Sequence, residues 1–211
     1  MIVGDVIDSR SRTDRERLRT ALEAGLDRAN EVVREGLVAP FAVLKGVDEV
    51  GGVLTDATVL YDILDGLRER LHPQELRVAV AAGEVDVGVD AGEVARMDGP
   101  AFHRADELLA TAETDDRWVG VDLGDGDDLL RTLLSDHVDL LFMIKADWTE
   151  RQTEVVRLYR TEDTMDAVAD RLGVSVQAVS QTLQAARARA VFDVEATLEA
   201  TLARIAREVE P

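Results

Sequence analysis

The stretch that decides the fold of the C-terminal part is TERQTEVVRLYRTEDTMDAVADRLGVSVQAVSQTLQAARARA, residues 149–190. Its apolar residues recur at helical spacing in three segments, which predicts three short amphipathic helices. Gly173 stands between the second and third helices, where a tight turn needs a residue that tolerates positive φ. Ser175 is placed as the N-cap of the third helix, so the pattern predicts a helix-turn-helix. The expected inward positions are Val155, Val156, Tyr159, Met165, Val168, Ala169, Leu172, Val174, Val179 and Leu183.

The outward face of the third helix carries small, amide and guanidinium side chains, which can reach base edges and phosphates in a major groove. No acidic residue occurs between residues 175 and 190. We therefore expect this helix to contact double-stranded DNA. The alternative is a three-helix unit that only packs, or that binds protein. The expected DNA-contacting residues are Ser175, Gln177, Ala178, Ser180, Gln181, Gln184 and Arg187.

Residues 148–152, 165–175 and 179–181 resemble the DNA-binding helix-turn-helix of bacterial sigma factor region four and of LuxR-type regulators. The resemblance implies DNA binding. A single small helix-turn-helix reads only a few base pairs, so we expect a homodimer on paired half-sites. An amphipathic helix is expected at residues 193–209, and it is the candidate for dimerisation; the alternative is that it packs on its own chain. Its apolar face comprises Val194, Leu198, Leu202 and Ile205.

The charge of the chain is strongly negative. Against 43 acidic residues stand 24 basic ones, a net charge of −19, and only Lys45 and Lys145 are lysines. This composition is typical of a salt-accumulating, halophilic cytoplasm, where a Debye length of about 3 Å at molar salt screens self-repulsion. The alternative is an ordinary acidic protein from a GC-rich genome. Residues 149–192, with six arginines and six acids, are neutral, as DNA contact favours.

Further limits come from what the sequence lacks. The chain contains no cysteine, which excludes disulfides, thiolate metal sites and a cysteine nucleophile. The first ten residues have no basic region followed by an apolar run, so we expect no signal peptide. No stretch approaches the roughly 18 uncharged apolar residues of a membrane span. We therefore expect a soluble cytoplasmic protein without a membrane partner.

The first part of the chain alternates strands and helices, and the order strand, helix, hairpin, helix, strand predicts an α+β fold. We expect a ferredoxin-like antiparallel sheet with helices on one face, in a domain of residues 1–134. A linker helix and the all-α helix-turn-helix domain follow at 135–192, and the closing helix at 193–211. The expected strands are residues 2–6, 41–45, 50–54, 76–82 and 118–121, and the expected helices are 13–34, 57–71 and 99–113.

Three blocks of this part, residues 2–10, 46–52 and 98–102, resemble the SatD family, small proteins whose members often carry a C-terminal helix-turn-helix. The family in turn looks distantly like the palm of nucleotide cyclases and diguanylate cyclases. In those enzymes acids on the first strand and at the hairpin bind two metals over a nucleoside triphosphate. The resemblance implies that Asp5, Asp48 and Glu49 hold Mg²⁺ or Mn²⁺ with a nucleotide, because carboxylate oxygens suit these cations.

Two departures from the family's hairpin sequence argue against catalytic activity. Family members tend to read Gly-Asp-Glu-Phe-Gln-Gly at the hairpin, whereas here Val47 replaces the turn glycine and Gly51 replaces the glutamine. Glycine allows a close backbone approach to phosphate, and β-branched valine does not. We therefore expect a DNA-binding transcriptional regulator with a non-catalytic cyclase-like domain. The alternatives are a metal-dependent nucleotide-binding or nucleotidyl-cyclising enzyme and a protein-binding adaptor.

Overall fold

The computed structural model describes residues 1–7, 15–33, 36–46, 48–72, 74–124 and 128–209. Residues 8–10 of the first family block, Val47 and the side chain of Ile205 lie outside this description. The chain folds into two compact units. We call residues 1–139 with 198–211 the sheet unit, and residues 140–197 the helical unit. None of the helices in the described part of the chain is long and apolar enough to cross a membrane.

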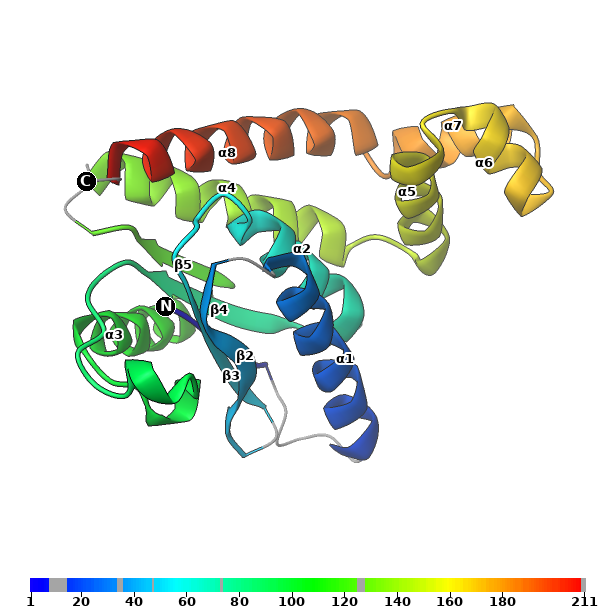
Figure 1. Ribbon diagram of the computed structural model, residues 1–211. Helices are drawn as coiled ribbons and strands as arrows, with labels where there is room; N and C mark the ends of the chain where they lie inside the picture. The colour runs from blue at the N-terminus through cyan, green and yellow to red at the C-terminus, as the bar shows by residue number, and fades with distance from the viewer. Residues whose placement is uncertain (8–14, 34–35, 47, 73, 125–127, 210–211) are drawn as a thin grey trace. The chain divides into compact units, whose positions relative to one another are not determined.

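A five-stranded mixed sheet forms the centre of the sheet unit (Figure 1). Its strands lie in the order β2-β3-β1-β4-β5, and the central strand β1 pairs antiparallel with both β3 and β4. The sequence predicts a wholly antiparallel sheet, and this is wrong for β5, which runs parallel to β4. The connection from β4 to β5 contains a helix and crosses back over the sheet. The chain therefore enters β5 at the same end of the sheet at which it entered β4, which makes the two strands parallel. The strands are β1 Ile2–Val6, β2 Leu37–Lys45, β3 Glu49–Leu54, β4 Leu76–Ala81 and β5 Val119–Asp122.

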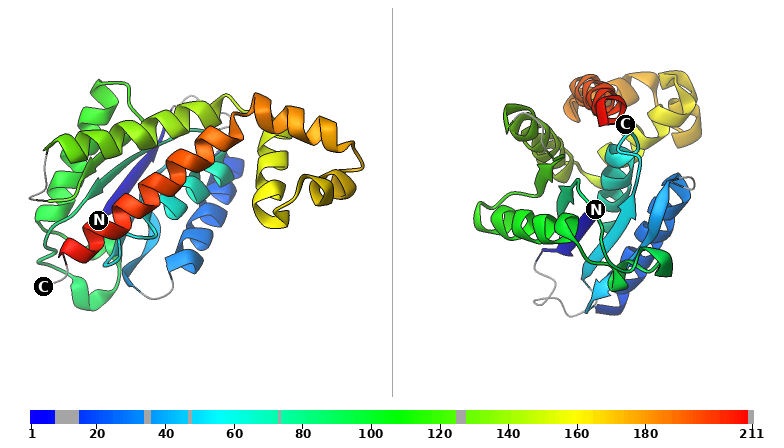
Figure 2. Two further views of the ribbon diagram at one scale, coloured as in Figure 1. Left: turned by 90° about the horizontal axis from the view of Figure 1, so that it is seen from above. Right: turned by 60° about the vertical axis from the view of Figure 1, so that its left-hand side comes forward.

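Helices cover both faces of this sheet, not one as the sequence predicts. Helices α1 (Arg15–Val33) and α2 (Leu60–Leu71) pack on each other along one face, and α3 (Pro100–Thr114) lies on the opposite face (Figures 1 and 2). Two short 3₁₀ turns, η2 (Val89–Ala91) and η3 (Val94–Arg96), precede α3. The core beneath α3 is made of small and flexible side chains, including Met1, Val3, Ala81, Ala101 and Ala105.

Helix side chains bind backbone groups at both edges of the sheet. Asp139 of α4 (Asp128–Ala146) accepts hydrogen bonds from the amides of Trp118 and Val119 at 2.8 and 3.1 Å. At the other edge the Asn30 side chain of α1 accepts from the Phe41 amide at 2.7 Å and donates to the Phe41 carbonyl at 3.0 Å. Unpaired strand edges favour association with other chains, so these contacts protect the sheet.

The helical unit contains three short helices between the end of α4 and the start of α8 (Ala188–Val209). They are α5 (Glu150–Glu162), α6 (Met165–Leu172) and α7 (Val176–Ala185). The predicted burial of Val174 is wrong, because this side chain follows the Gly173 turn and is 37% exposed. The shared core is made of Val155, Leu158, Val168, Ala169 and Val179, with Tyr159, Met165, Leu172 and Leu183 packed against it.

A buried ion-pair network joins three helices within this unit. Lys145 on α4 is 1% exposed, and its Nζ lies 2.6 Å from Oε1 of Glu195 on α8. The Arg160 guanidinium on α5 donates to both oxygens of the same carboxylate at 2.7 and 2.8 Å. Buried charges are stable only when they are paired and hydrogen-bonded. The network therefore fixes how α4, α5 and α8 meet inside the helical unit.

Candidate functional site

Hydrogen bonds within the helical unit fix both ends of α7, the helix expected to contact DNA. Gly173 ends α6 in the left-handed conformation at φ 64°, and the Ser175 hydroxyl accepts the Ala178 amide at 3.1 Å as the N-cap of α7. At the other end, the buried Trp148 indole donates to the carbonyl of Ala186 at 3.0 Å. The predicted cap and turn residues are thus confirmed. Because both ends are held, the backbone of α7 has a fixed place within the helical unit.

The seven residues expected to contact DNA all reach the surface of the helical unit. Gln177 and Gln181 on α7 are exposed, and Ala178 and Ser180 are half-buried. Some of their polar groups are already engaged within the chain: the Ser175 hydroxyl caps α7, and the Gln184 amide donates to the Ser180 hydroxyl at 3.4 Å. Gln177 and Gln181 are therefore the side chains of this face best able to bind an external partner.

Arg187 does not belong to the third helix, contrary to the sequence prediction. Helix α7 ends at Ala185, and Arg187 adopts a left-handed φ of 54° between α7 and α8. The residues on either side of it, Ala186 and Ala188, are buried, at 1% and 2% exposure. A non-glycine residue in this conformation carries a cost of roughly 1 kcal/mol, and such strain is often found at functional positions.

The three acids expected to bind metal lie at one end of β1 and β3. Asp5 is the register partner of Glu49 on β3 and of Arg77 on β4, so these three side chains share the α3 face of the sheet. Asp48 precedes Glu49, and its carbonyl accepts the Val6 amide at 3.1 Å. The structure therefore brings the predicted acids to a common region.

The electrostatic environment of Asp5 is one of repulsion. Burial raises the pKa of the Asp5 carboxyl, and the negative charges of Asp48, Glu49 and Glu113 raise this pKa further, while Arg77 lowers it. Among the described residues, however, no three His, Cys, Asp or Glu side chains gather closely enough to hold a metal ion. The Mg²⁺ or Mn²⁺ site stays a prediction, and no catalytic step follows from it.

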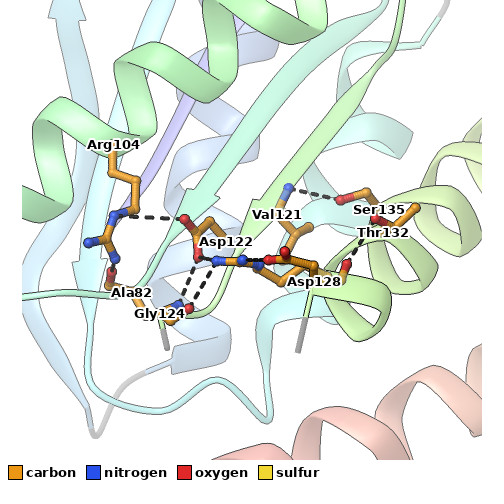
Figure 3. Close-up of polar contacts among 9 residues, drawn as sticks. Ala82, Arg104, Val121, Asp122, Gly124, Asp128, Thr132 and Ser135 are labelled. Carbon is orange, nitrogen blue, oxygen red and sulfur yellow. Dashed lines mark hydrogen bonds and ion pairs between the residues drawn. The ribbon is translucent and has the colours of Figure 1, made fainter. Parts of the chain in front are cut away.

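A second polar cluster lies where the parallel strands β4 and β5 end, the edge at which α/β sheets commonly bind ligands (Figure 3). Asp122 accepts the Gly124 amide and Nη1 of Arg131, each at 2.9 Å, and Nε of Arg104 lies 3.7 Å from its other oxygen. Arg104 also donates to the Ala82 carbonyl at 2.9 Å. Asp128 also pairs with Arg131, so two carboxylates balance two guanidinium groups and the cluster links the end of β5 to α3 and α4.

The comparison with protein families decides the identity of the chain. A family model described as the SatD family matches residues 1–197. The chain belongs to the SatD family. Comparison of this SatD-family chain with curated proteins and with solved structures gives no match. The matched residues include the whole sheet and helices α5 to α7.

Several residues of this SatD-family chain escape sequence analysis because their role depends on packing between distant segments. Glu113 is separated from Asp5 by most of the sheet unit, and only the docking of α3 brings its charge near β1. Tyr159 and Phe192 have ring centroids 6.3 Å apart, although 32 positions separate them. Helical spacing predicts Tyr159 as a core residue but gives no signal for its aromatic partner.

Proposed function

We propose that this SatD-family chain is a DNA-binding transcriptional regulator. Helices α6 and α7 act as a helix-turn-helix, and α7 is the recognition helix that enters the major groove. The observation that carries the proposal is the surface of α7. It combines exposed amide side chains, such as Gln177 and Gln181, with an absence of acidic residues from 175 to 190 in a chain of net charge −19.

The geometry of the helical unit supports this role. The Ser175 cap, the Gly173 turn and the Trp148 hydrogen bond orient α7 without using the side chains of Gln177 or Gln181. Amide side chains pair well with adenine in the major groove, and each good contact contributes about 1–3 kcal/mol to discrimination. Because phosphate attraction is weak for a chain this acidic, base contacts by α7 would supply much of the affinity.

For the sheet unit we propose a non-catalytic ferredoxin-like domain related to cyclase palms. The antiparallel part of the sheet has the order β2-β3-β1-β4, with α1 and α2 on one face, which supports this assignment.

Two copies of the chain would bind paired half-sites on DNA. On α8, Leu198 and Leu202 are 3% and 2% exposed, which favours packing of that helix on its own chain over dimerisation.

The test is genome-wide DNA occupancy of the tagged protein in cells, beside a Gln177→Ala, Gln181→Ala double variant. We expect discrete peaks that the variant loses, and an increase of at least about 10-fold in the Kd for a duplex taken from a peak. Arg157→Ala is a strict control, because it removes a positive charge from the exposed surface of α5 but leaves α7 intact.

Other outcomes redirect the proposal. Equal loss of binding in the control and the double variant would show attraction to phosphates without base recognition by α7. Flat occupancy in every form would contradict DNA binding. Nucleotide binding with Mn²⁺ that depends on Asp5, Asp48 and Glu49 would then favour the enzyme alternative, and a protein partner captured through α7 would favour the adaptor.

A further inference from the structure

An open groove of about 770 Å³ crosses the helical unit beside α7. The end of α5, the start of α6, the second half of α7 and the start of α8 line it. Its volume is within the range of sites for small organic molecules, roughly 300–1,000 Å³. Nothing in the DNA-binding role requires a hollow of this size, because a recognition helix binds through its convex outer face.

The lining of the groove is largely aromatic and aliphatic. Tyr159 and Phe192 stack with an interplanar angle of 12°, and both rings border the groove together with Met165 and Leu183. The Arg160 guanidinium, held by Glu195, lies 5.1 Å from the centroid of the Phe192 ring. Both aromatic residues contribute to the groove lining, where the apolar body of a ligand can pack against them.

Two arginines add positive charge to the rim of this groove. Arg187 and Arg189 are exposed lining residues, and within the described part of the chain neither guanidinium has an ion-pair or hydrogen-bond partner. By contrast Arg151 and Arg171 of the same unit pair with Glu154 and Glu162. In a chain with 43 acids, two guanidinium groups left without carboxylate partners favour an anionic ligand.

The residues that line the groove carry little negative charge. Asp193 is the one acidic residue among the groove's lining residues, so the two arginines leave the site with a net positive charge. Arg187 is also held in the left-handed conformation, which glycine would adopt without cost. A role of the guanidinium in binding a ligand in the groove would explain why arginine occupies this strained position.

We propose that this groove is the binding site for a small aromatic organic anion. The Tyr159 and Phe192 rings contact the planar apolar body, and Arg187 and Arg189 bind the anionic group. Ser180, Gln184 and Arg187 line the groove and also belong to the expected DNA-contacting set. Ligand and DNA therefore compete for these residues, which makes the anion an effector; this second step rests on the proposed function.

The first test is a fluorescence titration with 8-anilinonaphthalene-1-sulfonate, an aromatic anion, against the full chain. We expect saturable binding that Arg189→Ala weakens at least about 5-fold, since one charge-assisted contact is lost. Gln184→Glu should weaken it as well, because it places a negative charge at the rim. The matched control is Arg157→Ala, which removes an equal charge from a residue outside the groove and should bind the dye like the wild type.

The second test measures the Kd for duplex DNA with and without the dye. Competition predicts a higher Kd when the dye is present. Gln177→Ala should weaken DNA binding but leave dye binding unchanged, because Gln177 is not a lining residue.

The two proposals fail in different ways. Dye binding that depends on Arg189, in a protein that binds no DNA, supports the groove and overturns the regulator. No dye binding, or equal binding by the Arg189→Ala and Arg157→Ala variants, overturns the groove whatever happens with DNA. DNA affinity unaffected by bound dye overturns the effector step.

Discussion

At the scale of single residues, Lys145 shows how much one charged side chain can determine. It is one of two lysines in the chain, and it is 1% exposed beside the Glu195 carboxylate. Removing one member of a buried ion pair deprives the other charge of a partner, which lowers the stability of the fold. Glu195 keeps its two hydrogen bonds from Arg160, so the remaining network softens the loss.

We therefore predict that Lys145→Met destabilises the helical unit by about 3 kcal/mol. The chain offers a matched control in Lys45→Met, because Lys45 is exposed at the end of β2 and its replacement should cost less than about 0.5 kcal/mol. Denaturant unfolding of both variants, followed by circular dichroism, measures the difference. Equal stability of the two variants would show that the pair contributes nothing.

At the scale of elements, glycine has opposite meanings in a strand and in a helix. A Cβ atom on Gly52 of β3 would lie 2.6 Å from Cδ1 of the buried Phe41 ring on β2. A Cβ atom on Gly66 of α2 would meet nothing within 4 Å. The strand glycine makes room for an aromatic ring, whereas the helix glycine only lowers helix propensity.

This contrast predicts opposite signs for the same substitution. Gly52→Ala should destabilise the sheet unit by about 1–3 kcal/mol, because the Phe41 ring must move in a packed core. Gly66→Ala should stabilise it by about 0.5–1 kcal/mol, through reduced chain entropy in the unfolded state. The measurement is the urea midpoint of each variant compared with that of the wild type, at equal m-value. A Gly66→Ala variant less stable than the wild type would contradict the prediction.

At the scale of the whole molecule, the net charge of −19 is the dominant property. Repulsion between like charges opposes a compact state, and salt screens it as the Debye length falls from about 10 Å at 0.1 M to about 3 Å at 1 M. Ion pairing does not cancel this excess, because acidic residues outnumber basic residues 43 to 24.

We accordingly predict that raising KCl from about 0.1 M to about 2 M increases the melting temperature by at least about 5 °C, or roughly 2 kcal/mol of stability. Differential scanning calorimetry across a KCl series provides the measurement. The increase should be steepest below about 1 M, where screening changes most. A melting temperature that is highest at low salt would point instead to an ordinary acidic protein adapted to dilute buffer.

The sequence by itself determined the features that depend on neighbours along the chain. The Ser175 cap and the Gly173 turn were predictable because capping and left-handed turns involve residues only a few positions apart. The acid excess and the SatD family follow from composition and ordered motifs. Tertiary structure alone decided the parallel pairing of β5, the docking of α3 on the second face and the end of α7 before Arg187. It also decided the meeting of Tyr159 with Phe192, because such contacts depend on packing between distant segments, which no local pattern encodes.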